Sequence, residues 1–290
     1  MVKRTAAAHK GIPATENPRK RSQVNTRTTG KSSGQPTKKL SPLDEWKRGR
    51  EKAIGNSDWY IYDNTIRKLV SEINQHLSIS KNIEQYRPLD WKLIKAMIWT
   101  ETGATVAAWK TRPIQIGNTG DEGIKEVAIP ARPRKYNIII PKAWGPYLIN
   151  KTDLIRSNPE YNIRAGIALL MIKMSETEKD KTVYDDENEY TYEVVNGDRG
   201  YSSIAKKIGT TQGVLTTLNG VKVIHIGSKL KYKKAHIEQY IPGWYLFTPE
   251  NIQKQYNIDP TKTQPGHRGD HTYADKIRFT YDLIVADERK

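Results

Sequence analysis

The chain has 290 residues, which is enough for about two compact domains. It contains no cysteine, so a disulfide framework, a thiolate metal site and a cysteine nucleophile are all excluded. The formal net charge of +16 first suggests a nucleic-acid partner. However, residues 1–50 hold 13 Lys and Arg against 3 acidic residues, whereas the remaining 240 residues hold 35 against 29. Most of the excess therefore belongs to one end of the chain and does not mark a folded binding face.

That basic end, residues 1–54, is rich in Lys, Arg, Thr, Ser, Gly and Pro and has almost no large apolar side chain before Trp46. Such a segment cannot bury enough surface to offset its ordering entropy, so we expect a disordered tail. It would serve as a solvated linker, as a delivery signal or as an electrostatic attachment to an anionic polymer. The first residues lead into polar sequence, so no secretory signal is predicted, and no apolar run reaches the roughly 20 residues of a membrane helix.

Three longer helices are predicted after the tail. The first begins near Trp59, the second covers about 89–102, and the third opens at Asn158-Pro159, where a capping residue precedes a first-turn proline. Between the second and third helices, residues 112–150 are rich in proline and read as irregular. An acidic polar stretch at 185–189 reads as a linker.

Residues 190–233 have the texture of a very small fold. A short strand around Tyr192 is followed by a turn, a helix ending at Gly209, a helix from Thr211 to Leu218 and a closing strand to Tyr232. Its motifs, in order, are Tyr192-Glu193-Val194, Gly197-Asp198, Ser203-Ile204-Ala205, Gly209-Thr210, Leu215-Thr216-Thr217-Leu218-Asn219 and Gly227-Ser228-Lys229-Leu230.

This run closely resembles a LysM domain, a βααβ module that binds glycans containing N-acetylglucosamine. The resemblance places a shallow sugar groove beside the first strand–helix turn and the loop before the last strand. The resemblance implies that the groove is lined by Gly197, Asp198, Arg199, Tyr201, His225 and Ile226.

Glu101 is the candidate catalytic residue. Met97, Ile98 and Glu101 share one helix face, because residues three and four positions apart line up. A carboxyl group beside apolar neighbours has a raised pKa, and glycosidic cleavage needs such a group to protonate the leaving oxygen. From this pattern alone, an ordinary exposed glutamate at a helix end is the better explanation of the residue.

Four short motifs add to that pattern: Trp99-Thr100-Glu101-Thr102-Gly103, Pro113-Ile114-Gln115-Ile116, Asn162-Ile163-Arg164-Ala165-Gly166, and Tyr256-Asn257 followed by Tyr273-Ala274-Asp275-Lys276-Ile277. In this order they resemble the motifs of the soluble lytic transglycosylase and goose-type lysozyme superfamily. The resemblance implies that Glu101 is the catalytic acid/base, that Tyr256 contacts it and that Gln115 lies in the sugar cleft. It also implies substrate contacts for Thr102, Asn118 and Asn257.

The chemistry of such a site has two possible outcomes. In an inverting hydrolase a second carboxylate activates water, whereas a lytic transglycosylase uses the sugar's own 6-hydroxyl and leaves a 1,6-anhydro end. Asp121 is the one acid near the motif that could face Glu101, although its setting also reads as a surface turn. The sequence slightly favours the transglycosylase.

The expected fold is therefore a mainly α, lysozyme-like domain formed by residues 55–180 and 236–290, with a LysM module inserted at 188–234 and a disordered basic tail. The expected function is a peptidoglycan-degrading muramidase without cofactor or metal, because the His267-Arg268-Gly269-Asp270-His271 run reads as surface. Such an enzyme would be made in the cytoplasm and act in the periplasm or cell wall of a target cell. It would be a secreted antibacterial effector of a type VI-like machine, with a cognate immunity protein, or a phage endolysin. The alternatives are a non-catalytic peptidoglycan-binding protein on a degenerate lysozyme scaffold and a nucleic-acid binder whose basic charge lies in the tail.

Overall fold

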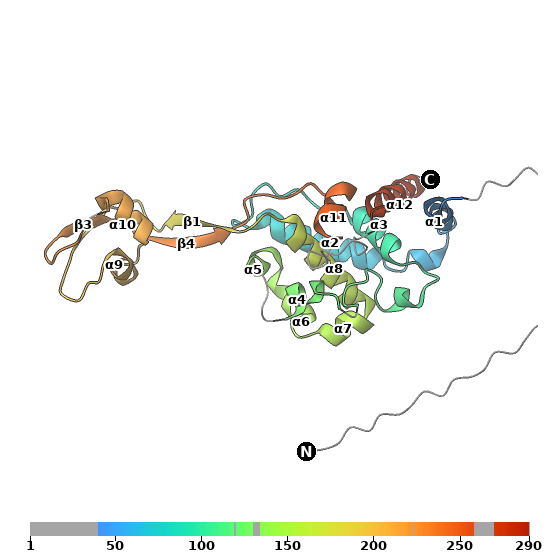
Figure 1. Ribbon diagram of the computed structural model, residues 1–290, viewed down its shortest axis with the longest axis horizontal. Helices are drawn as coiled ribbons and strands as arrows, with labels where there is room; N and C mark the ends of the chain where they lie inside the picture. The colour runs from blue at the N-terminus through green and yellow to red at the C-terminus, as the bar shows by residue number, and fades with distance from the viewer. Residues whose placement is uncertain (1–39, 119, 130–133, 222, 258–269, 290) are drawn as a thin grey trace, which may run out of the picture. The chain divides into compact units, whose positions relative to one another are not determined.

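The computed structural model describes residues 40–118, 120–129, 134–221, 223–257 and 270–289. The predicted disorder of residues 1–39 lies outside these ranges. Over the described residues the fold is mainly α-helical with two small antiparallel sheets, as expected (Figure 1). The elements before the first strand are α1 (Pro42–Glu51), η1 (Ser57–Trp59), α2 (Asp63–Ile79), α3 (Trp91–Glu101), η2 (Ala107–Lys110), α4 (Gly123–Ala128), α5 (Tyr136–Ile139), η3 (Lys142–Trp144), α6 (Gly145–Leu148), α7 (Thr152–Ser157) and α8 (Pro159–Met174).

The elements that follow are β1 (Lys179–Tyr184), β2 (Tyr190–Glu193), α9 (Tyr201–Ile208), α10 (Gln212–Asn219), β3 (Lys229–Tyr232), β4 (Ala235–Tyr240), α11 (Pro249–Gln255) and α12 (Tyr273–Asp287). We call residues 42–174 together with 249–287 the helical body. The four elements from β2 to β3, residues 190–232, are called the small module.

Helix α8 forms the centre of the helical body. It begins where predicted, because the Asn158 side chain accepts hydrogen bonds from the Glu160 and Tyr161 amides and Pro159 occupies the first turn. From Asn162 onward every residue of the helix except Lys173 is buried, so this part of the helix has no polar face. It packs against α2, α4, α5, α6, α7 and α11.

Helices α3 and α12 form the second main contact of the helical body. The C-terminal residue of α3 is hydrogen-bonded to Tyr273 at the start of α12, and Asp90 before α3 is hydrogen-bonded to Tyr281 further along α12. The two helices therefore run antiparallel. As a consequence, the end of α3 that carries Glu101 faces the N-terminal end of α12.

The prediction of disorder up to residue 54 is wrong for residues 42–54. The Ser41 side chain caps α1, Pro42 occupies its first turn, and α1 packs against α12. Trp46 meets Phe279 edge-on, and Ala53 is buried in the core. One tryptophan thus gives this polar helix enough apolar contact to be held on the body.

Residues 112–150 are also more regular than predicted, because they contain α4, α5, η3 and α6. These helices have only three to six residues each. That length is too short for a helical repeat of apolar residues to appear in the sequence. Their buried side chains, among them Val127, Ile139 and Trp144, complete the core beneath α8.

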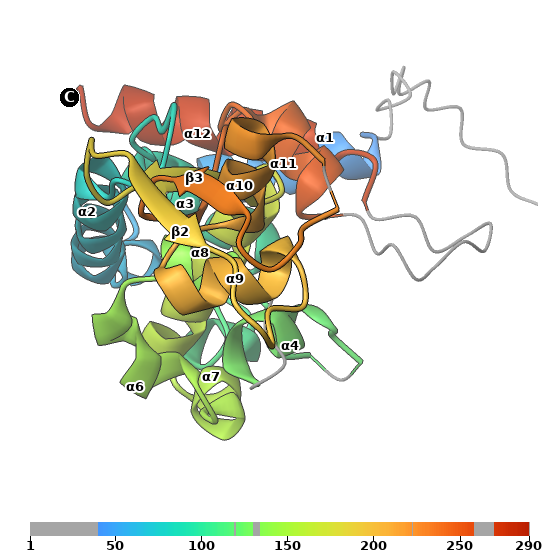
Figure 2. The ribbon, with the colours of Figure 1, turned by 90° about the vertical axis from the view of Figure 1, so that its left-hand side faces the viewer.

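The small module has its own apolar core, made by Val194, Ile204, Ala205, Leu215 and Leu230. Strands β2 and β3 pair antiparallel, from Tyr190 with Tyr232 to Glu193 with Lys229. Helix α9 ends at Gly209 in the left-handed conformation, and the Thr211 hydroxyl caps α10. Figure 2 shows these four elements gathered together.

A second antiparallel pair joins the small module to the helical body in sequence. Strand β1 follows α8, and β4 precedes α11. Their register runs from Lys179 with Tyr240 to Tyr184 with Ala235, so the two strands lie side by side (Figure 1). The chain thus leaves the body and returns to it through one paired ribbon, which the sequence did not predict.

Candidate active site

Glu101 is the last residue of α3. The turns before it are buried, with Met97 and Ile98 fully inside the core, and the Glu101 side chain itself is half-buried. Gly103 follows closely, and a Cβ at this position would come within 2.6 Å of the Trp59 ring. The sequence therefore places a carboxyl group where an apolar helix ends abruptly against an aromatic wall.

The ionisation of Glu101 is strongly displaced from that of an exposed carboxyl. Burial raises the pKa of Glu101 to about 7, although the hydrogen bond from Tyr273 opposes this rise. The charges of Asp121 and Asp270 raise the pKa further, and the Lys276 ammonium lowers it. A carboxyl with this pKa is populated in both forms near neutrality, which suits a group that first donates and then accepts a proton.

Tyr273 provides the direct hydrogen bond to Glu101. Its hydroxyl donates to Glu101 Oε1 at 2.6 Å. Burial and the neighbouring Glu101 raise the pKa of Tyr273 well above its ordinary value, so the phenol keeps its proton and remains a donor. Sequence reasoning placed Tyr273 in a motif but gave it no role, because the register of α12 against α3 is not visible in the chain.

Tyr256 was predicted to contact Glu101, and this contact stays a prediction, whereas Tyr273 makes the hydrogen bond to Glu101 that the structure shows. Tyr256 lies just after α11 and is half-buried. Burial, followed by the charges of Glu101 and Asp121, raises the pKa of Tyr256 well above its ordinary value. Tyr256 is therefore close enough to feel both carboxylates, but the antiparallel packing of α12 on α3 is what aims a hydroxyl at Glu101.

Gln115 lies on a tight turn with an unusual backbone. Its φ is +59°, a left-handed value that a residue with a side chain adopts only when its surroundings enforce it. Its amide donates to Arg112 O at 3.1 Å, and its side-chain oxygen accepts from Asn118 Nδ2 at 3.0 Å. Asn118, which was predicted to contact substrate, thus orients the side-chain amide of Gln115 in this structure.

Two side chains and one glycine hold this turn in place. Asn162 is fully buried, accepts from the Ile114 amide and donates to Ile116 O, so it brackets Gln115 on both sides. Thr102 is buried, and its hydroxyl donates to Pro113 O at 2.8 Å. A Cβ at Gly166 would come within 2.4 Å of Ile114. The Asn162-to-Gly166 motif therefore acts by positioning the turn, and Thr102 does the same from α3.

Asp121 forms the turn that its sequence suggested. Its two carboxylate oxygens accept from the Gly117 amide at 2.7 Å and the Gly123 amide at 2.8 Å. Its charge nevertheless raises the pKa of Glu101, so the turn lies within electrostatic reach of the site. Asp121 is thus brought near Glu101 with both oxygens already engaged by backbone.

The first turn of α12 completes the surroundings of Glu101. Asp270 accepts from the Thr272 amide and is paired with Lys276, and its backbone oxygen accepts from Asn257 Nδ2 at 3.4 Å. Within the described residues, no group of three His, Asp or Glu side chains could hold a metal ion. His267, Arg268 and Gly269 of the run dismissed as surface lie outside the described residues.

In the small module, the two predicted groove segments lie together. The Gly227 amide donates to Val194 O, and the Tyr201 hydroxyl donates to Gly220 O at 3.0 Å. Of the predicted groove residues, Gly197, Arg199, His225 and Ile226 are exposed.

Asp198 and Tyr201 have internal duties in the module. Asp198 accepts from the Val195 amide at 2.9 Å and from the Tyr192 hydroxyl at 2.8 Å, and only 6% of its side chain is exposed. Tyr201 packs against the module core. The exposed rim that a ligand could contact is therefore smaller than predicted, because the side chains of Asp198 and Tyr201 make hydrogen bonds within the module.

Comparison with family models, with curated proteins and with solved structures gives no match, so the residues themselves carry the functional argument. None of the helices in the described part of the chain combines the length and the apolar character needed to cross a membrane.

Proposed function

We propose that the chain is a peptidoglycan-degrading muramidase that cuts the bond between N-acetylmuramic acid and N-acetylglucosamine, with Glu101 as acid/base. The observation that carries the proposal is the state of Glu101: a carboxyl at the end of a buried helix, with a pKa of about 7 and one tyrosine hydrogen bond. Gln115, held at a strained φ by Asn162 and Thr102, supports a built site nearby.

In the first step Glu101 donates its proton to the glycosidic oxygen while the bond from that oxygen to the anomeric carbon breaks. Positive charge develops on the ring, and the Glu101 carboxylate is left beside it. Tyr273 donates to that carboxylate and stabilises it at this moment. Proton donation of this kind typically contributes about 100- to 10,000-fold to rate.

The second step distinguishes a transglycosylase from a hydrolase. In the transglycosylase, the 6-hydroxyl oxygen of the same sugar attacks the anomeric carbon, and its proton passes to Glu101. We favour this outcome because both Asp121 oxygens already accept backbone hydrogen bonds, which ties that carboxylate to its turn. In the alternative hydrolase, Asp121 would activate water instead.

The small module would hold the enzyme on its polymer. Its resemblance to LysM domains supports binding to N-acetylglucosamine units along the rim that carries Arg199, His225 and Ile226. Tethering raises the local substrate concentration without changing the chemistry. The peptidoglycan strand is then both ligand and substrate, and the mechanism requires neither a cofactor nor a metal.

Delivery to a target cell wall is part of the same proposal. An enzyme of this kind fits a secreted antibacterial effector of a type VI-like machine, with an immunity protein as partner, or a phage endolysin. A non-catalytic peptidoglycan-binding protein is the second candidate, because the small module could act without the helical body. The raised pKa of Glu101 favours the enzyme.

Digestion of purified peptidoglycan, followed by mass spectrometry of the soluble fragments, tests the proposal. We expect the parent chain to release muropeptides and Glu101→Gln to release none, since the amide has nearly the same shape but cannot deliver a proton. Coinciding circular-dichroism spectra of the two proteins are the control for folding, because Glu101 lies in the helical body, whose core is separate from that of the small module. Equal muropeptide release by the two proteins would overturn the assignment.

A further inference from the structure

A hollow of about 320 Å³ lies away from Glu101, between two segments that are distant in sequence. One segment precedes α3 and the other precedes α11, and they are joined by hydrogen bonds between Ile241 and both Asn82 and Glu84 (Figure 1). The lining residues are Gln85, Tyr86, Arg87, Trp244, Tyr245, Leu246 and Phe247. Since α3 has 11 residues, it places Glu101 roughly 15 Å from the segment that leads into it.

The walls of this hollow are aromatic and rigidly held. Tyr86 and Trp244 meet edge-on with ring centroids 5.0 Å apart, and Phe247 follows at 6.4 Å from Trp244. The Tyr86 hydroxyl donates to Asn74 Oδ1 at 2.5 Å. The Tyr245 amide donates to Met174 O at 2.9 Å, which anchors the other wall to the end of α8.

Two features of the segments that line the hollow are costly to the fold. Trp244 Nε1 is buried and has no hydrogen-bond partner among the described residues, although a buried indole N–H normally finds an acceptor. Gln85 has a φ of +55°, a left-handed value that is strained for a residue with a side chain. Arg87, the second residue after Gln85, lines the hollow and is exposed.

We propose that this hollow is a second saccharide-binding site, which takes one N-acetylated sugar unit of a glycan chain. A sugar ring presents an apolar face that stacks on aromatic side chains and a polar edge that takes hydrogen bonds. The Arg87 guanidinium lines the hollow, is exposed and offers N–H donors, for which an acetamido carbonyl is an acceptor. The volume lies at the lower end of the range for small-molecule sites, which suits a single ring. The choice of sugar rests on the proposed function.

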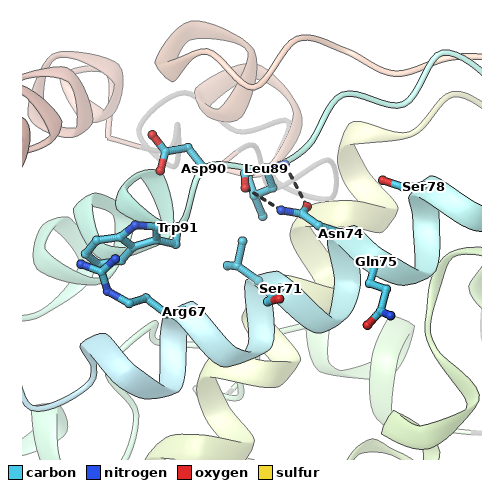
Figure 3. A pocket seen from close by; sticks show the side chains of 9 residues that line it. Arg67, Ser71, Asn74, Gln75, Ser78, Leu89, Asp90 and Trp91 are labelled. Atoms are coloured by element: carbon cyan, nitrogen blue, oxygen red, sulfur yellow. Dashed lines mark hydrogen bonds between the residues drawn. The ribbon is translucent and has the colours of Figure 1, made fainter.

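A larger hollow of about 640 Å³ along α2 does not make the same case (Figure 3). Its best-placed polar groups already have partners in the protein: Asn74 is hydrogen-bonded to both backbone atoms of Leu89, and Arg67 stacks on Trp91 and pairs with Glu288. Asn74 also holds Tyr86. Asn74, which lines the larger hollow, therefore fixes Tyr86 in the wall of the smaller one.

The test uses the position of the tryptophans. All seven lie outside residues 188–234, so indole signals do not report directly on sugar bound to the small module. We would label the full chain, carrying Glu101→Gln so that no sugar is consumed, with 5-fluorotryptophan. The resonance of Trp244 is assigned by its loss in Trp244→Phe. Tetra-N-acetylchitotetraose is then titrated and followed by fluorine NMR.

We expect the Trp244 resonance to shift with a saturable dependence on sugar concentration. Arg87→Ala should weaken that dependence about tenfold, the size of one charge-assisted hydrogen bond. Lys81→Ala is the matched control, because it removes an exposed positive charge from the same segment outside the hollow. It should leave the titration unchanged.

A Trp244 resonance that stays in place while calorimetry shows the chain saturated with sugar would overturn the proposal. A shift caused by a peptidoglycan stem peptide but not by the sugar would overturn it as well. The readout is binding by a variant unable to cleave, so a failure of this site and a failure of the muramidase assignment are told apart.

Discussion

Two opposing influences set the pKa of the Glu101 carboxyl group. Burial disfavours its charged form, whereas the hydroxyl of Tyr273 and the ammonium of Lys276 favour it. The balance leaves the pKa at about 7. A group used first as acid and then as base works best when neither form is strongly preferred at the operating pH.

This displacement of pKa makes the stability of the protein depend on pH. The pKa of Glu101 is about 7 in the folded chain, against an ordinary value of 4.5 that applies to the unfolded chain. Between these two pH values the folded chain therefore binds more protons than the unfolded chain. Stability therefore falls as pH rises through this window. We expect Glu101→Gln to match the parent near pH 4 and to exceed its unfolding free energy by about 1–3 kcal/mol near pH 8. Urea unfolding at both pH values measures this, and an equal difference at both would contradict it.

Tyr273→Phe should change the pH profile of cleavage. The lost hydrogen bond had favoured the carboxylate, so the pKa of Glu101 rises further and the alkaline limb of the rate profile moves to higher pH. The maximal rate should fall about tenfold, because the carboxylate formed on proton donation loses one strong hydrogen bond. Tyr256→Phe is the control and should move the limb less. The reverse order would restore Tyr256 as the direct partner.

At the scale of elements, α8 and α3 together fix the turn that carries Gln115. Asn162 satisfies three backbone groups with one side chain, at Ile114, Ile116 and Ile155. Gly166, one helical turn later, lets Ile114 approach the helix closely. The turn is thus placed by packing against the most buried helix of the body, which gives it a rigid support.

Gly166→Ala tests this arrangement. The added Cβ would lie 2.4 Å from Ile114, so the turn must shift, and we expect a loss of roughly 1–3 kcal/mol together with a lower kcat. Gly213→Ala on α10 is the matched control, since its Cβ meets only Thr211 Oγ1 at 3.7 Å. Helix propensity alone should make that variant neutral or more stable by up to about 1 kcal/mol. Thermal unfolding and cleavage assays on both variants decide the point, and similar losses in both would refute close packing at Gly166.

The elements also show what the sequence could predict. Helices α2, α3 and α8 were predicted because each has several turns of apolar repeat, and α8 also has a cap at Asn158. Helix α1 was missed because its contacts reach across the chain to Phe279. The pairing of β1 with β4 was missed for the same reason, since their partners are more than 50 residues apart. Glu101 was singled out by short motifs and their resemblance to a known superfamily, whereas its hydrogen bond with Tyr273 depends on the register between two helices.

At the scale of the whole molecule, the small module and the helical body have separate cores. If the exposed rim of the module binds glycan, Ile226→Ser should lower retention on insoluble peptidoglycan several-fold and leave the turnover of soluble chains unchanged. Ile226 is 70% exposed, so the substitution costs little stability. Ile79→Ser on α2, 76% exposed, is the control for loss of surface apolarity. Equal loss on soluble and insoluble substrate would assign the module a structural role instead.

The product of cleavage reports on how the second step is organised. We expect fragments that end in 1,6-anhydro sugars. The 6-hydroxyl is part of the substrate, and Glu101 alone can take its proton, so no second carboxylate is needed. Mass spectrometry separates the two outcomes, since an anhydro end is one water lighter than a reducing end. Asp121→Asn would loosen its turn, because an amide offers only one acceptor oxygen to the amides of Gly117 and Gly123. It should therefore reduce the rate modestly without changing the product. Reducing ends in the parent digest that disappear in Asp121→Asn would make Asp121 the base and the protein a hydrolase.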